Sequence, residues 1–157
     1  MKARIWQTLF LLNALLTTEV SFAENPNKDV RDLKEQNIMS VLYQQTAAER
    51  LASSLQTFSS AKRALDKALA NPSWSALPGQ NVMDKKTAII VDIDETVLDN
   101  TAYEARMILD GTKYPEGWVN WGKEESATEV PGAKDFLNYA ASKDVTIFYI
   151  TNRVVEL

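Results

Sequence analysis

Two aspartates at the end of an apolar run have the spacing best suited to chemistry. The stretch TAIIVDIDETVLDNTAY runs from Thr87 to Tyr103 and places Asp92 and Asp94 on either side of Ile93. In an extended strand, residues i and i+2 point to the same side, so the two carboxylates would lie close together. Two such carboxylates repel each other unless a cation lies beside them or one of them is protonated. The pair therefore predicts either a Mg2+ site or a general acid beside a second carboxylate.

Simpler interpretations of the same stretch stand beside this one. Acidic residues at the end of a strand often form only a solvated turn, and Asp94 or Thr96 could cap a following helix. A calcium loop starting at Asp92 is excluded, because Val97 stands where such a loop needs glycine and Tyr103 where it needs glutamate. The solvated turn and the helix cap stay open.

The composition excludes several classes of site. The chain of 157 residues contains no histidine and no cysteine, which rules out catalysis by those residues, zinc–thiolate sites and disulfides. Its net charge of −4 argues against a nucleic-acid partner. Any chemistry must therefore come from carboxylates, hydroxyls, amines, backbone groups or a hard metal ion.

The N-terminus has the three parts of a secretory signal peptide. MKAR is the positively charged start, IWQTLFLLNALL is a short apolar stretch, and small residues precede a cleavage site after Ala23. A membrane anchor is the alternative, but the stretch is short for a spanning helix, and Gln7 and Asn13 interrupt it. We expect residues 1–23 to be removed, leaving a periplasmic or secreted protein with no stable membrane anchor. The sequence does not indicate its oligomeric state.

Helical spacing dominates the region 24–80. From Asn27 to Asn71 there is neither glycine nor proline, and leucines recur at helical intervals. We expect one or two long helices there, with any break at Ser53-Ser54 or at Ser59-Ser60.

Two apolar runs in the second half predict strands buried on both faces, as in a parallel sheet. They are Thr87–Ile93 and Val145–Ile150. Between them we expect a helix over 97–110, an aromatic loop over 111–122, and then a helix with Pro131 in its first turn.

This order of elements is a crossover unit, which predicts an α/β fold. We expect an open, parallel, Rossmann-like sheet, only partly present in residues 81–157, with N-terminal helices packed outside it. Ligands of such sheets bind beyond the carboxyl ends of the strands. Asp92 and Asp94 stand at one such end, and Thr151 and Asn152 stand at the other. These four residues should therefore meet at one edge of the sheet.

Five blocks of the sequence occur in the order found in a known enzyme family. They are YQQTAAE, VDIDETVLDNTAY, YPEGWVNW, VPGAKDFLNYA and IFYITNR. In these blocks the chain resembles the secreted class B and class C acid phosphatases of the haloacid-dehalogenase superfamily. The resemblance covers roughly residues 35–153.

The resemblance implies hydrolysis of phosphate monoesters, such as nucleoside monophosphates or aryl phosphates. Asp92 would be the nucleophile that forms an aspartyl-phosphate, and Asp94 the general acid and base. The Asp92 carboxylate and the Asp94 backbone carbonyl would bind Mg2+. Phosphate would be bound by Thr151 and by backbone N–H groups near Ile93 and Asn152.

The polar and aromatic residues around this site have two interpretations. The tryptophans could form a small core, or a substrate pocket could use an aromatic ring to stack on the leaving group. Arg153 could pair with phosphate or with Asp99, and we expect the pair with Asp99. The candidate pocket residues are Asn100, Tyr103, Trp118 and Trp121.

Two further pieces of the family have no counterpart before Leu157: a later lysine and a later acidic pair. We therefore interpret residues 24–157 as the N-terminal part of one acid phosphatase domain that by itself is inactive and folds poorly. The alternative is a non-catalytic secreted binding or storage-like protein on the same fold. Because both Asp92 and Asp94 are intact, the enzyme is the favoured interpretation.

Overall fold

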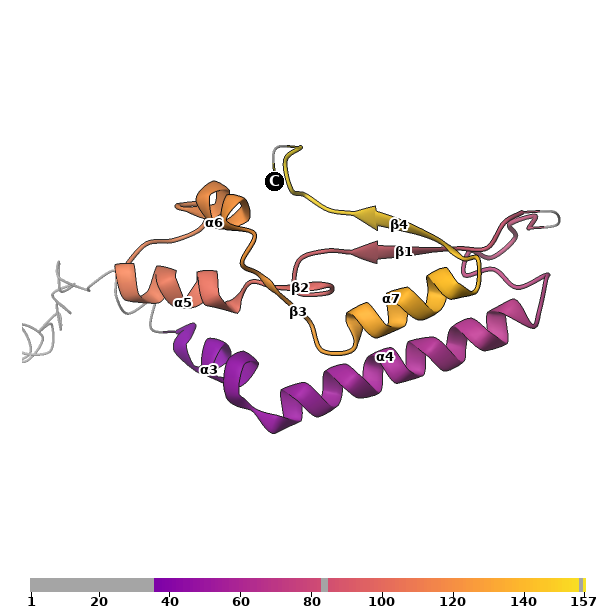
Figure 1. Ribbon diagram of the computed structural model, residues 1–157, viewed down its shortest axis with the longest axis horizontal. Coiled ribbons are helices and arrows are strands. Elements are labelled where there is room, and N and C mark those ends of the chain that lie inside the picture. Colours follow the sequence, from indigo (N-terminus) through magenta and orange to yellow (C-terminus); the bar gives the residue numbers. More distant parts are fainter. Residues whose placement is uncertain (1–35, 83–84, 156) are drawn as a thin grey trace, which may run out of the picture.

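The computed structural model describes residues 36–82, 85–155 and 157. Its elements, in order, are α3 (Ile38–Thr46), α4 (Ala48–Leu69), β1 (Ala88–Asp92), β2 (Leu98–Asp99), α5 (Thr101–Asp110), α6 (Trp118–Glu124), β3 (Thr128–Glu129), α7 (Ala133–Ser142) and β4 (Thr146–Ile150) (Figure 1). The predicted signal peptide, residues 1–23, lies outside this part of the chain. No helix within the described ranges has both the length and the apolar character needed to span a membrane.

The centre of the fold is a parallel pair of strands, as the sequence predicts. β1 pairs with β4 in a register that sets Ala88 opposite Thr146 and Asp92 opposite Ile150. A second, shorter pair joins β2 and β3 in antiparallel fashion. Between β1 and β4 the chain passes through β2, α5, α6, β3 and α7 in that order. This long crossover allows β4 to run parallel to β1.

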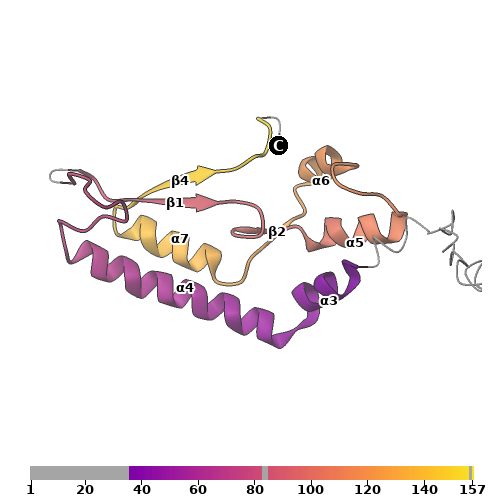
Figure 2. The ribbon, with the colours of Figure 1, turned by 180° about the vertical axis from the view of Figure 1, so that it is seen from behind.

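Only one face of the main sheet is covered by the described elements. α7 and α4 lie on the same side of β1 and β4 in both views (Figures 1 and 2). Leu65, Ala140 and Val145 form the core there, and Ile89 and Ile147 pack against it from the sheet. The expectation of strands buried on both faces is wrong for this part of the chain, since side chains of the opposite face remain exposed.

The break between the N-terminal helices falls at Ala47 and not at either predicted serine pair. Ala47 has an extended backbone (φ −77°, ψ 126°), whereas all four serines lie inside α4. Three of the four hydroxyls, those of Ser54, Ser59 and Ser60, have hydrogen-bond partners in the fold. Ser54 is buried and donates to the Pro131 carbonyl at 2.7 Å, while the two later serines accept hydrogen bonds from Arg63. The four serines therefore do not interrupt α4.

Long-range contacts also shift three boundaries of the crossover. The first residues of the expected helix 97–110 are partly in β2, because β3 pairs with them, and α5 begins only at Thr101. Part of the expected loop 111–122 is helical, as α6. Pro131 precedes α7 and is not in its first turn. Gly132 separates them at φ 89°, a left-handed conformation that glycine adopts readily.

We expect Leu65→Ala to loosen the packing of α4 on α7. Leu65 is buried in the core beneath the sheet, so its truncation leaves a cavity worth about 2–5 kcal/mol in a well-packed site. Amide hydrogen exchange of α7 should become at least about tenfold faster. Leu51→Ala is the matched control, because Leu51 lies on the same helix but is half exposed. Equal protection in the two variants would show that α4 does not hold α7 in place.

Candidate active site

The predicted catalytic residues converge at the carboxyl ends of the two parallel strands. Asp92 is the last residue of β1 and lies opposite Ile150, so Thr151 follows at the next position of the neighbouring strand. The Thr151 hydroxyl lies 3.4 Å from Oδ2 of Asp94. The side chain of Asp92 is exposed, and its Oδ2 lies 3.4 Å from the Thr96 hydroxyl.

A tight turn after β1 separates the environments of the two aspartates. The Ile93 carbonyl accepts backbone hydrogen bonds from Thr96, Val97 and Leu98. Glu95 has φ 57°, a left-handed value that is uncommon for residues other than glycine. The turn brings the chain back on itself, so that Asp94 bridges to Leu98 and lies against the start of α5. The open alternatives of a solvated turn and a helix cap therefore do not describe Asp94, whose side chain has specific partners.

Arg153 and Asn100 hold the side chain of Asp94. Arg153 donates to Asp94 Oδ1 from Nε at 3.0 Å and from Nη2 at 2.7 Å, and Asn100 donates from Nδ2 at 2.9 Å. The Arg153 side chain is only 10% exposed and that of Asp94 25% exposed. Charge-assisted hydrogen bonds of this kind are strong where water is scarce. All three donors reach the same oxygen, which leaves Oδ2 facing Thr151.

The expected pairing of Arg153 with Asp99 is wrong. Asp99 instead accepts hydrogen bonds from the backbone N–H and the hydroxyl of Thr101, at 2.9 and 2.5 Å. This local turn at the start of α5 directs Asp99 away from Arg153. The parallel register sets Arg153 beside Asp94, and sequence spacing alone does not contain that register.

Asn100 connects Asp94 to the aromatic residues. Its side chain is 2% exposed, and its Oδ1 accepts from the indole N–H of Trp121 at 2.8 Å and from Arg153 at 3.2 Å. These two donors fix the orientation of the amide, so that its N–H group points to Asp94. Asn100 is therefore a structural link behind the site. Its place among the candidate pocket residues remains a prediction.

The aromatic residues divide into a buried pair and a ring nearer the site. Tyr103 and Trp121 are 4% and 3% exposed and pack with Met107, and the Tyr103 hydroxyl donates to the Glu116 carbonyl. Trp118 is partly exposed. Its ring centre lies 5.0 Å from the Arg153 guanidinium, in a cation–π contact. Of the predicted pocket aromatics, Trp118 therefore has the position best suited to meet a substrate.

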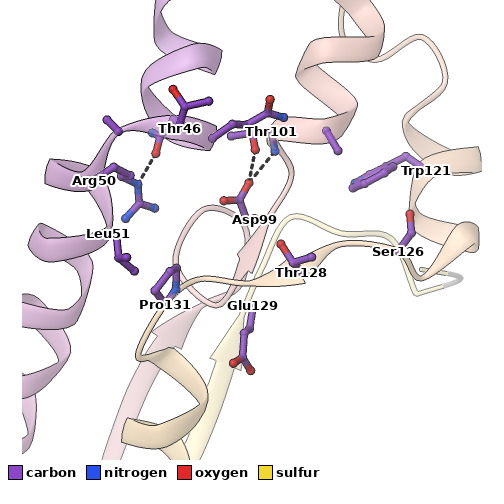
Figure 3. A pocket seen from close by; sticks show the side chains of 15 residues that line it. Thr46, Arg50, Leu51, Asp99, Thr101, Trp121, Ser126, Thr128, Glu129 and Pro131 are labelled. Atoms are coloured by element: carbon purple, nitrogen blue, oxygen red, sulfur yellow. Dashed lines mark hydrogen bonds between the residues drawn. The ribbon is translucent and has the colours of Figure 1, made fainter.

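One cavity of the described residues is separate from this edge. It has a volume of about 620 Å³ and lies at the bend between α3 and α4, beside the start of α5 and β3. Figure 3 shows Arg50, Asp99 and Thr101 around it, with the hydrogen bonds from Thr101 to Asp99. Trp121 is the one predicted site residue in its lining. The residues of the two-aspartate edge, Asp92, Asp94 and Thr151, therefore lie outside this cavity.

Of the two carboxylates at this edge, only that of Asp92 is fully available to a hard cation. Asp92 offers an exposed carboxylate, whereas Oδ1 of Asp94 is already occupied by Arg153 and Asn100. This division agrees with a metal held by the Asp92 carboxylate and the Asp94 backbone carbonyl, since Mg2+ binds through few protein oxygens. Within the described ranges, no group of three or more Asp, Glu, His or Cys residues could hold a metal ion.

Burial and neighbouring negative charge raise the pKa values of two side chains of α5, Glu104 and Tyr103. Burial raises the pKa of Glu104, and the nearby Glu95 carboxylate raises it further. Burial also raises the pKa of Tyr103, with a second contribution from Glu104. A carboxyl whose pKa is raised on folding destabilises the folded state above its unfolded pKa, and this cost disappears as the pH falls. The charged form of Glu104 is therefore a cost of this arrangement at neutral pH.

Residues 13–157 match the family described as HAD superfamily, subfamily IIIB (acid phosphatase). The chain belongs to this family. Two solved structures of the class C acid phosphatase from Bacillus anthracis are similar to it, one of them with tungstate bound. Each is 40% identical over 78% of this chain, with TM-scores of 0.68 and 0.69. Each match covers 48% of that chain, so the family member described here spans about half the length of its solved relative. The predicted α/β fold is confirmed.

We expect Asn100→Ala to expose the indole N–H of Trp121 to solvent exchange. The substitution removes the oxygen that accepts this N–H, and an unpaired buried donor costs about 1–3 kcal/mol. In heteronuclear NMR spectra, the Trp121 indole proton should exchange at least about tenfold faster. The indole of Trp74, which is exposed, serves as the internal control. An unchanged rate would mean that Asn100 does not anchor the indole.

Proposed function

We propose that this chain carries the nucleophile and the general acid of a phosphate monoesterase that forms an aspartyl-phosphate with Mg2+. The observation that carries the proposal is the difference between the two aspartates. Asp92 is exposed at the end of β1, whereas Asp94 is held by Arg153 and Asn100 beside Thr151. The exposed carboxylate of Asp92 can reach phosphorus, whereas the side chain of Asp94 is held so that one oxygen, Oδ2, keeps a fixed position for proton transfer.

Asp92 would act as the nucleophile. One of its carboxylate oxygens forms a bond to phosphorus while the bond from phosphorus to the ester oxygen breaks. A Mg2+ ion, when bound, would offset the repulsion between the carboxylate and the phosphate. Water then attacks the aspartyl-phosphate, which releases phosphate and restores Asp92.

Asp94 would transfer the proton. Arg153 and Asn100 both bind its Oδ1, so Oδ2 is the oxygen available to protonate the leaving ester oxygen. The same oxygen can take a proton from the attacking water in the second step. The three hydrogen bonds to Oδ1 would keep the carboxyl group in one orientation during both transfers.

Thr151 would bind a phosphate oxygen through its hydroxyl. This hydroxyl accepts a hydrogen bond from the Arg153 backbone N–H at 3.1 Å and donates its own proton to Asp94 Oδ2 at 3.4 Å, a long contact that a phosphate oxygen would replace. Backbone N–H groups near Ile93 and Asn152 would complete the phosphate site. Tungstate is a tetrahedral oxyanion like phosphate, and its presence in a structure of the Bacillus anthracis relative supports an oxyanion site of this kind.

The whole protein's substrates would be small phosphomonoesters, either nucleoside monophosphates or aryl phosphates. The partly exposed ring of Trp118, beside Arg153, supports a substrate with an aromatic leaving group. A non-catalytic binding protein on the same fold remains the second candidate. The distinction is whether Asp92 becomes phosphorylated, because a binder has no need of a covalent step.

A chimera that joins this chain to the part of the Bacillus anthracis enzyme outside the match tests the activity. We expect it to hydrolyse aryl phosphates and nucleoside monophosphates at acidic pH, with Mg2+ required. Asp92→Asn should abolish turnover, because an amide is a far weaker nucleophile than a carboxylate. Asp94→Asn should slow hydrolysis by about 10²–10⁴-fold, the usual contribution of a general acid–base group.

Asp110→Asn is the matched control for both aspartate variants. Asp110 is exposed at the end of α5, so its substitution should leave the rate unchanged. Full activity in the Asp92→Asn chimera, or in the presence of EDTA, is incompatible with the proposed mechanism.

The 157-residue chain on its own should lack Mg2+-dependent phosphatase activity, because its described residues offer too few metal ligands. A colourimetric assay with an aryl phosphate checks this point. Measurable Mg2+-dependent turnover by this chain would contradict the expectation.

We further propose that the mature protein is periplasmic or secreted and begins at Glu24. Its N-terminal sequence has the charged, apolar and small-residue regions of a signal peptide. When the chain is expressed in a bacterium with a periplasm, mass spectrometry of the exported fraction should find Glu24 as the first residue. A membrane-retained chain that still begins at Met1 would refute the proposal.

A further inference from the structure

The two side chains that hold Asp94 are themselves held by tryptophans of α6. Asn100 donates to Asp94 Oδ1 at 2.9 Å and accepts from the indole N–H of Trp121 at 2.8 Å. Arg153 donates to the same carboxylate oxygen at 2.7 Å, and its guanidinium lies 5.0 Å from the ring centre of Trp118. The two tryptophans are three residues apart, so they share one face of the helix. The helix α6 is therefore linked to Asp94 by two routes.

The route through Trp121 decides which end of the Asn100 amide meets Asp94. An indole N–H and a guanidinium can only donate hydrogen bonds. Because Trp121 and Arg153 both contact the same amide atom of Asn100, that atom must be the carbonyl oxygen. The N–H2 group is then the end that faces Asp94 Oδ1. The opposite orientation would set N–H2 against two donors and an oxygen against the carboxylate, so all of these bonds would be lost.

The indole that orients the amide has a fixed position of its own. The ring of Tyr103 stacks on Trp121 with 6.3 Å between the ring centres, and the guanidinium of Arg106 lies 4.9 Å from the indole ring centre. Asn100 and Trp121 are only 2% and 3% exposed, so water has little access to the bond between them. A buried polar group that loses its partner is not compensated by solvent. The orientation of the amide therefore depends on the indole N–H.

We propose that Trp121 is a positioning residue for the general acid and acts through Asn100. This role rests on the proposed function of Asp94 as the group that transfers the proton. While the amide N–H2 group binds Oδ1, the proton of Asp94 is confined to Oδ2, the oxygen beside the Thr151 hydroxyl. An amide turned the other way would accept a proton from Oδ1, which would leave none on Oδ2 for the leaving ester oxygen.

The first test uses the full 157-residue chain and does not depend on activity. Trp121→Phe removes the indole N–H but keeps a ring in the aromatic cluster of α5 and α6. In heteronuclear NMR spectra, the side-chain N–H2 protons of Asn100 should exchange with water at least about tenfold faster, because one of the two donors that orient the amide is gone. Trp74→Phe is the matched control, since Trp74 is 56% exposed, and it should leave this rate unchanged.

The second test measures how the chimera releases good and poor leaving groups in a single turnover. An alkoxide needs a proton to depart, whereas 4-nitrophenolate needs little help from a general acid. We expect Trp121→Phe to slow the release of an alcohol from an alkyl phosphate at least about tenfold. The release of 4-nitrophenol from its phosphate should change about twofold or less. Trp74→Phe should leave both rates unchanged.

Asn100→Asp separates positioning from packing. This variant keeps an oxygen that accepts the indole N–H of Trp121, but it replaces the N–H2 group that binds Asp94 with a second oxygen. It should show the same selective loss with the alkyl phosphate, while the exchange of the Trp121 indole proton stays slow. A merely structural role of Asn100 and Trp121 would slow the release of both leaving groups equally.

Two results would overturn the positioning role. They are an unchanged exchange rate of the Asn100 amide in Trp121→Phe, and equal effects on the two phosphates in both variants. Failure of the proposed function is distinguishable, because the chimera would then hydrolyse neither phosphate or would keep its activity in Asp92→Asn. In that case the exchange rate of the Asn100 amide still accepts or rejects its link to Trp121.

Discussion

The parallel pairing of β1 with β4 is the constraint on which the rest of the structure depends. It sets Asp92 opposite Ile150, so the residues that follow each strand meet at one edge although about 58 positions separate them in the chain. Asp94, Thr151 and Arg153 become neighbours only through this register. The helices α4 and α7 support it from below, through Leu65 and Ala140 packed against Ile89 and Ile147. A shift of one residue would turn the apolar set of β4 to the wrong face.

The second organising feature is the buried polar network behind Asp94. An ion pair with so little exposure is favourable only when its remaining donors and acceptors are satisfied. Asn100 meets this need, because it donates to Asp94 and accepts from both Arg153 and Trp121. Trp118 covers the guanidinium of Arg153 from one side. The aromatic cluster of α5 and α6 is thus coupled to one aspartate, while the other stays exposed to solvent.

The two faces of the sheet have opposite characters for a simple geometric reason. Side chains alternate along a strand, so Ile89 and Ile147 reach the helices while Ile90 and Phe148 point away from them. A strand that is apolar at nearly every position suits a sheet covered on both sides. Here the described elements cover one side only. The apolar pattern of β1 therefore predicts packing on both faces of the sheet, whereas the described elements pack on one face only.

The sequence by itself determined the α/β class, the two parallel strands and the meeting of their carboxyl ends. These features depend on local patterns: β-branched runs, helical spacing and the known direction of a crossover. Only the tertiary structure decided the helix break at Ala47, the helix α6, the partner of Arg153 and the one-sided covering of the sheet. Each of these depends on contacts between residues far apart in the chain. Ser54 meets Pro131, and Arg153 meets Asp94, at separations of 77 and 59 residues. Local propensity and spacing contain no information about such partners, because they are fixed only when the strands take their register and the helices pack.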